Sequence, residues 1–203
     1  MTSIKFQLPP LPEKSDELFT SEDDWWNNAC LNFFQDGWGL YAIGYKEAAD
    51  ILVKHVNDER QYQDVLIYPI VFLYRQYLEL AIKDLIRHGR RLLDIHEPFP
   101  KTHRIATLWN ICSALLSKIS PGDSEREIKE IGRLLEEFCK VDPTSEAFRY
   151  PENKNGHPSL PGIKHINIRN ISEVVNKISV ILKGADAQID QYLSLKQEMN
   201  NYY

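Results

Sequence analysis

The feature that most constrains the fold is a long apolar segment between about Val65 and His88. Its apolar side chains recur at spacings of three and four and extend almost around the helix that this spacing predicts. Such a helix must be covered on most sides, so we expect it at the centre of a helical protein. Pro69 falls near its expected start, and Gly89 is expected to end it. The stripe comprises Ile70, Leu73, Tyr74, Tyr77, Ala81 and Leu85.

Four further segments show the spacing of amphipathic helices, and a shorter one follows Ser21 and Asp24, which match a capping box. Thr102, Ser124 and Asn170 are the expected first residues of three of these helices. The polar tail after residue 193 is expected to fray. The fold class predicted is therefore all-α, a single-domain bundle of five or six helices. Besides residues 65–88, the expected helices cover residues 25–34, 37–56, 102–120, 124–138 and 170–193.

Two regions are not expected to be helical. Residues 1–20 contain Pro9, Pro10 and Pro12 and are predicted to be an extended arm, followed by one domain over residues 21–198. The second region, residues 141–169, contains four prolines and Asn155-Gly156. Alternating apolar residues on both sides of Asn-Gly, at 148 and 150 and at 166 and 168, indicate a small β-hairpin. A loop of this length is more often functional than idle.

Composition favours a cytoplasmic protein that does not span a membrane. Three widely spaced cysteines, Cys30, Cys112 and Cys139, form no metal or disulfide pattern and indicate buried thiols in a reducing compartment. The N-terminal residues lack the features of a signal peptide. No segment approaches the roughly 18 uninterrupted apolar residues of a membrane-spanning helix.

The net charge of −5 argues against nucleic-acid binding by the whole surface, but the charges are unevenly distributed. Residues 83–104 contain six Lys or Arg and three histidines against three acids. Residues 148–169 contain four Lys or Arg and two histidines against one acid. These segments are either solvated faces or parts of one basic surface that forms when the chain folds.

Motif searches predict no cofactor and no metal. The sequence has no GxxxxGK[ST] phosphate loop, no HExxH metal motif and no GxSxG nucleophile elbow. The letters GxGxxA at residues 37–42 lack the preceding strand that a dinucleotide site requires. No two of the six histidines lie three or four residues apart, so helical spacing offers no metal site.

Three polar features are candidates for function. Arg75 and Glu79 lie one helical turn apart in the most apolar helix and are expected to form a structural polar pair. His103, near a helix start, is either an acid/base group or a capping and packing residue. Arg149-Tyr150, followed by a proline that restricts the tyrosine, suits phosphate and base binding, or docking of the loop onto the core.

Residues 65–193 resemble the HEPN family of helical domains. The resemblance rests on FLYRQYLELAIKDLI, on Thr102-His103 with Leu108-Trp109, on Phe148-Arg149-Tyr150-Pro151 and on the helix from Asn170. It implies a helical bundle, a homodimer, and a role in bacterial toxin, defence or nucleotide-linked systems. Active HEPN ribonucleases carry Arg, four to six residues, then His near a helix start.

This sequence departs from that motif. After Arg169, the motif requires His at one of residues 174–176, but these are Val, Val and Asn. After Arg149, it requires His at one of residues 154–156, but these are Lys, Asn and Gly. Arg90 and Arg91 fit the spacing to His96, but all three are expected in a connector.

Three functions therefore remain open. The first is a non-catalytic HEPN-like module that binds RNA, a nucleotide or a protein partner. The second is a metal-independent ribonuclease using His103 and Arg149. The third is a structural adaptor. The ligand-binding residues expected are Arg149, Tyr150, His103, Lys164, His165 and Arg169.

Overall fold

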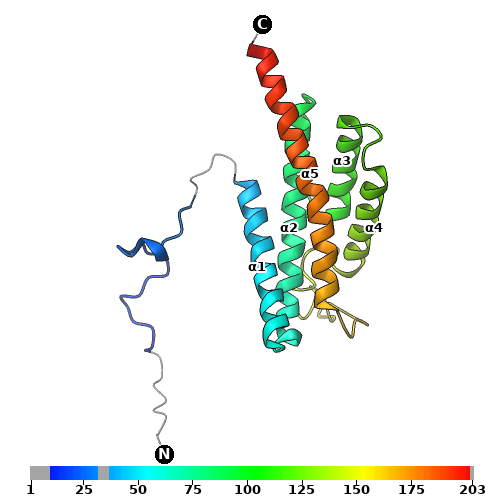
Figure 1. Cartoon of the computed structure of the whole chain (residues 1–203). Helices are drawn as coiled ribbons and strands as arrows, with labels where there is room; N and C mark the ends of the chain where they lie inside the picture. Colours follow the sequence, from blue (N-terminus) through cyan, green and yellow to red (C-terminus); the bar gives the residue numbers. More distant parts are fainter. Residues whose placement is uncertain (1–9, 32–36, 202–203) are drawn as a thin grey trace, which may run out of the picture. The chain divides into compact units, whose positions relative to one another are not determined.

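The computed structural model describes residues 10–31 and 37–201. The chain divides into two compact units, residues 1–35 and residues 36–203. The described part of the second unit is a bundle of five α-helices, which confirms the predicted fold class (Figure 1). The helices are α1 (Trp38–Glu59), α2 (Gln63–Leu92), α3 (Ile105–Ile119), α4 (Glu125–Val141) and α5 (Ile168–Asn201).

The N-terminal unit contains less helix than the sequence predicts. Among its described residues only Trp25–Asn27 are helical, as a single 3-10 turn, and Asn28 is already extended. The expected helix is therefore wrong over residues 28–31, while residues 32–34 lie outside the described residues. Residues 10–20 contain no helix or strand, with one turn at residues 14–15 and a bend at residues 18–19, and Pro9 is not described. The domain limits 21–198 stay a prediction.

Helix α2 is the central element, as predicted, and packs against α1, α3 and α5, whereas α4 packs on α3. It begins at Gln63 and continues through Pro69. Gly89 does not end it, because this glycine serves packing instead. A Cβ atom at Gly89 would lie 3.4 Å from the Cδ1 atom of Ile119 and 3.7 Å from the Cβ atom of Leu115. The missing side chain thus allows α3 to approach α2 closely.

By length and composition alone, α2 could cross a membrane. A central bundle helix has the same composition, because neighbouring helices cover it on most sides. The buried residues of α2 include five with charged side chains: Arg75, Glu79, Lys83, Asp84 and Arg90. Such residues are rare in membrane-spanning segments, so their presence fits a bundle core.

Helices α1, α2 and α5 share a polar contact inside the bundle. The hydroxyl group of Tyr74 donates a hydrogen bond to Oδ1 of Asp50 on α1 at 2.6 Å. The same hydroxyl group lies 2.9 Å from Oγ of Ser172 on α5. Burial, together with the Asp50 carboxylate, raises the pKa of Tyr74 well above its ordinary value. The phenol therefore stays protonated and joins the three helices.

Three expected helix starts are displaced or differently capped. Helix α3 begins at Ile105, after Thr102, whose Oγ1 accepts a hydrogen bond from the backbone N–H of Arg104 at 3.1 Å. Ser124 precedes α4 but adopts the left-handed conformation, with φ of 51°, and makes no side-chain capping bond. Helix α5 begins before Asn170, because Oδ1 of Asn167 accepts the hydrogen bond from the backbone N–H of Asn170 at 3.0 Å.

The polar tail is helical rather than frayed up to Asn201. The ammonium group of Lys196 donates hydrogen bonds to the carbonyl oxygen of Leu92 at 2.9 Å and to Oδ2 of Asp94 at 2.6 Å. These bonds hold the last part of α5 against the end of α2.

The loop at residues 142–167 contains no strand. Its only β-type pairing is an isolated antiparallel bridge between Glu152 and Pro158, which flanks Asn155-Gly156. Gly156 has φ of 75°, the left-handed conformation that glycine tolerates best. The pairing of residues 148–150 with residues 166–168 is not formed, because Phe148 is buried and Ile168 begins α5. The predicted hairpin is thus reduced to one bridge.

Candidate functional site

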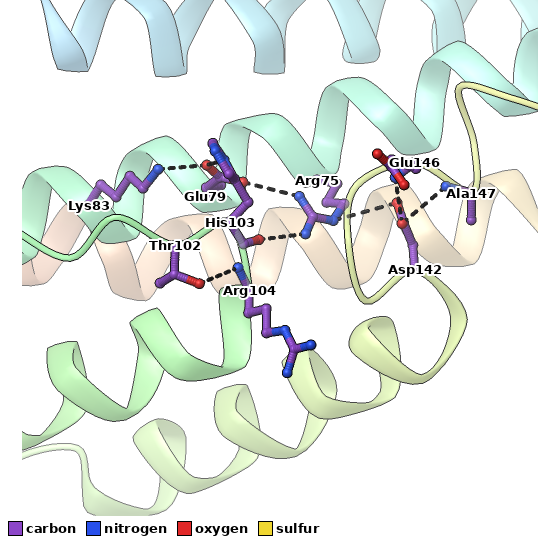
Figure 2. Close-up of polar contacts among 9 residues, drawn as sticks. All are labelled: Arg75, Glu79, Lys83, Thr102, His103, Arg104, Asp142, Glu146 and Ala147. Atoms are coloured by element: carbon purple, nitrogen blue, oxygen red, sulfur yellow. Dashed lines mark hydrogen bonds and ion pairs between the residues drawn. The ribbon is translucent and has the colours of Figure 1, made fainter. Parts of the chain in front are cut away.

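The guanidinium group of Arg75 is fully buried where α3 begins and α4 ends (Figure 2). Its Nη1 donates to Oε2 of Glu79 at 3.1 Å, and its Nη2 donates to the carbonyl oxygen of His103 at 2.7 Å. Its Nε lies 3.5 Å from Oδ2 of Asp142, at the end of α4. The predicted Arg75–Glu79 pair is present and is part of a larger buried cluster.

Asp142 connects this cluster to the long loop. Its Oδ1 accepts hydrogen bonds from the backbone N–H groups of Glu146 at 2.9 Å and Ala147 at 3.2 Å. The side chain of Asp142 is 1% exposed, so its charge depends on these donors and on Arg75. The loop is therefore fixed to α2 directly before Phe148-Arg149-Tyr150.

Glu79 bonds both to the interior and to the surface. Its Oε1 accepts a hydrogen bond from Nζ of Lys83 at 2.7 Å and lies 2.8 Å from Nδ1 of His103. Burial raises the pKa of Glu79, but the hydrogen bonds and positive charges of Lys83 and His103 together outweigh burial. The pKa of Glu79 is therefore below its ordinary value, and the carboxylate is ionised at neutral pH.

His103 is oriented by this carboxylate and is otherwise open to water. Its side chain is 74% exposed. Because an ionised carboxylate only accepts hydrogen bonds, Nδ1 carries a proton and donates it to Glu79. No group in the described part of the chain bonds to Nε2 of His103. The arrangement therefore presents Nε2 to solvent.

Arg149 and Tyr150 form an exposed pair beside α2. The guanidinium carbon of Arg149 lies 5.7 Å from the ring centre of Phe72 and 5.1 Å from that of Tyr150. Its Nη2 also donates to the hydroxyl oxygen of Tyr150 at 3.0 Å. Phe72 and Glu79 are seven residues apart and share one face of α2, about 10 Å apart along the helix axis. Arg149 and His103 therefore lie along the same helix face.

The other predicted residues, Lys164, His165 and Arg169, come from the end of the long loop and the start of α5. Lys164 and His165 line a hollow against the start of α2, at Gln63 and Tyr68. Arg169 is exposed in the first turn of α5. Its side chain makes no hydrogen bond or ion pair with any residue that the structure describes. The structure thus groups Arg149 with Tyr150 beside Phe72 of α2, and it places His103 beside Glu79, two helical turns further along α2. Arg169 forms no hydrogen bond or ion pair with any of these described residues.

Sequence reasoning missed Asp142, Lys83 and Phe72. Lys83 and Phe72 could have been found, because they lie four residues after Glu79 and seven before it on one helix face. Asp142 gave no such signal, since only folding brings the end of α4 to Arg75.

The prediction that Arg90, Arg91 and His96 all lie in a connector is wrong for the two arginines. Arg90 and Arg91 lie in the last turns of α2, and only His96 lies in the connector. The guanidinium group of Arg90 bonds to Oε2 of Glu97 at 2.9 Å and to the carbonyl oxygen of Pro98 at 2.9 Å. Arg90 therefore fastens the connector to α2.

Asp84, His88 and Asp186 form a second polar cluster, between α2 and α5. One ligand atom from each lies within 4.8 Å of the others, a grouping that could hold a metal ion. Nη2 of Arg87, however, donates to Oδ1 of Asp84 at 2.7 Å and therefore already supplies positive charge. We interpret the cluster as an ion-pair contact between helices. Helical spacing could not reveal it, because Asp186 comes from α5.

The hydrogen bond to Asp186 raises the pKa of His88 above its ordinary value, although burial opposes the change. Burial in turn raises the pKa of Asp84, and Arg87 opposes that change. The charge state of the contact between α2 and α5 therefore responds to pH.

Comparisons with known proteins identify no relative: no protein-family model, no curated protein and no solved structure matches the chain. The resemblance to HEPN domains accordingly stays a prediction.

Proposed function

We propose that this chain is a HEPN-like module that binds single-stranded RNA, or a nucleotide, without cleaving it. The observation that carries the proposal is the exposed Arg149–Tyr150 pair, stacked beside Phe72 on the same face of α2 as His103. An arginine fork binds phosphate oxygens with two hydrogen bonds. An exposed aromatic ring stacks on bases of any sequence.

The charge around this pair is consistent with an anionic ligand. Lys101 and Arg104 flank His103 and are exposed. Lys164 lies on the loop that also carries Arg149. Glu79 and Asp142 are the acidic groups that contact His103 and Arg75, and both are buried and paired, so they present little negative charge to solvent. Nearer to Arg149, Glu146 is partly exposed but lies 3.3 Å from Nζ of Lys154, whereas Glu152 is exposed. A phosphate backbone along this face would meet Arg149, Lys101 and Arg104, with Glu152 as the opposing exposed charge.

One observation favours the alternative, a metal-independent ribonuclease. Nδ1 of His103 is held by Glu79, and Nε2 is presented to solvent, which is how a general acid or base is commonly oriented. Against this, the sequence match to the spacing of the HEPN catalytic motif, Arg90 or Arg91 with His96, does not include His103. Among the described residues, the imidazole of His103 is bonded by the Glu79 carboxylate alone. Incubating the protein with RNA and a chelator distinguishes the two functions. Cleavage that survives the chelator and is lost in His103→Ala would establish the ribonuclease.

The remaining expectations belong to the same proposal. The HEPN resemblance and the composition together suggest a homodimer, a cytoplasmic location, a role in a bacterial defence or stress system, and a protein partner. Size measurement in solution by light scattering tests the dimer directly.

A structural adaptor is the third candidate function. It predicts that Arg149→Gln leaves partner binding unchanged.

A further inference from the structure

Helix α4 leaves part of the bundle unfilled. Only Ile131 and Leu135 of α4 are buried, because α4 packs on α3. Between α4, α2 and α5 lies a cavity of about 390 Å³ that is partly open to solvent. Its volume is within the roughly 300–1,000 Å³ range of small-molecule sites.

Away from its mouth, the wall of the cavity is apolar. Helices α2, α4 and α5 contribute aliphatic and aromatic side chains, and the long loop closes one end with Phe148 and Ile166. Water gains few hydrogen bonds against such a wall, whereas an apolar ligand gains dispersion contacts and leaves water. Representative wall residues of the three helices are Val71, Leu78, Leu134, Phe138, Val174 and Ile178.

The polar residues of the cavity are exposed and mark its mouth. His165 and Asn170 lie there, at the start of α5, where backbone N–H groups of the first turn favour a negative charge. The carboxylate of Glu137 also lines the mouth, but it is 3.5 Å from Nη1 of Arg133 and is thereby partly compensated. Lys164, next to His165 in the sequence, lines the adjacent hollow at the start of α2, which shares His165 with this cavity. The mouth therefore suits an anionic group.

We infer that this cavity binds a small amphiphile with an anionic head, such as a medium-chain carboxylate. The chain occupies the space between α2, α4 and α5, and the carboxylate lies at the mouth beside His165 and Asn170. The inference goes beyond RNA binding, because the ligand's chain occupies the interior of the bundle rather than the surface at Arg149 and Tyr150; His165 alone belongs to both sites.

Calorimetric titration of the full chain with hexanoate, octanoate and decanoate tests the inference. We expect one ligand per chain, with an affinity that rises about fourfold for each methylene until the cavity is full. Decanol, which has no charge, should bind at least about tenfold more weakly if the head group contributes as a charge-assisted hydrogen bond does. Equal affinity for decanol would overturn the assignment of the anionic head.

Two variants and one control locate the site. Val174→Phe fills the cavity and Asn170→Trp blocks its mouth, so each should weaken decanoate binding by about sixteenfold or more, the equivalent of two lost methylenes. Val180→Phe makes the same change as the first variant at an exposed position of α5 and should bind decanoate as the wild type does. Circular dichroism confirms that each variant is folded. No binding by the wild type, or unchanged binding in both variants, would overturn the inference.

Discussion

The Nδ1 atom of His103 lies 2.8 Å from the Oε1 atom of Glu79, so an exposed imidazole is held by a buried carboxylate. The other oxygen of that carboxylate accepts a hydrogen bond from Arg75, which also contacts Asp142 below the long loop. The two surface features of the candidate site, His103 and the loop with Arg149, are therefore positioned by one buried cluster. Changes inside the bundle should alter the surface site.

The first prediction concerns Arg75. Replacing it in Arg75→Met leaves the carboxylates of Glu79 and Asp142 buried with fewer partners, which should lower the free energy of unfolding by about 3–5 kcal/mol. Urea denaturation measures this change. Arg133→Met removes an arginine whose ion pairs on α4 are exposed, and it should have little effect. A near-wild-type midpoint for Arg75→Met would contradict the account of the cluster.

The second prediction concerns acid stability. The pKa of Glu79 is below its ordinary value of 4.5 in the folded protein, so its contribution to stability is present above that pH. The contribution is lost as the pH falls through the folded value. The wild type should therefore lose more stability than Glu79→Gln when the pH is lowered from about 6 to about 3, values that bracket the ordinary pKa by about one to two units. Equilibrium urea denaturation at both pH values measures the two losses. Parallel pH profiles would contradict the prediction.

The third prediction concerns His88, whose pKa is raised above its ordinary value of 6.5, first by the hydrogen bond to Asp186. The stabilisation is fully present below that pH and is lost as the pH rises through the folded value. Asp84 also favours the charged ring, whereas Arg87 and burial oppose it. The difference in stability between the wild type and His88→Gln should therefore shrink as the pH rises from about 6 to about 8. A constant difference would show that the charge of His88 does not join α2 to α5.

The fourth prediction compares two glycines inside helices. A Cβ atom at Gly184 would meet no atom within 4 Å, so Gly184→Ala should stabilise the protein by about 0.5–1 kcal/mol through helix propensity. A Cβ atom at Gly132 would lie 3.1 Å from Nε1 of Trp109, which must shift. Gly132→Ala should therefore gain less or lose stability. Thermal unfolding of both variants measures the difference, and equal gains would contradict the tight packing at Trp109.

The helices were predictable because their signal is local. The apolar stripe of α2 follows from residue spacing, and burial of Tyr74 and Tyr77 confirms it. Helix ends were less predictable, because tertiary contacts decide them. Helix α2 continues past Gly89, where α3 packs closely against it. The end of α5 stays helical where Lys196 donates a hydrogen bond to the carbonyl oxygen of Leu92.

The site was predictable only in part, for the same reason. The Arg75–Glu79 pair lies within one helical turn and could be inferred from spacing. The contacts that complete it come from the start of α3 and the end of α4, and no sequence spacing relates these to α2. Likewise, the hydrogen bond between His103 and Glu79 depends on a connector that returns along α2.

The central claim, that this chain binds RNA through Arg149, is tested most directly by fluorescence anisotropy with a labelled single-stranded RNA at several salt concentrations. For the wild type we predict that affinity falls linearly with salt on logarithmic axes. For Arg149→Gln we predict weaker binding and a slope smaller by about 0.7, the value for one phosphate contact on a single strand. Arg133→Gln, on α4, should match the wild type. No binding, or the same affinity and slope in Arg149→Gln, would contradict the account.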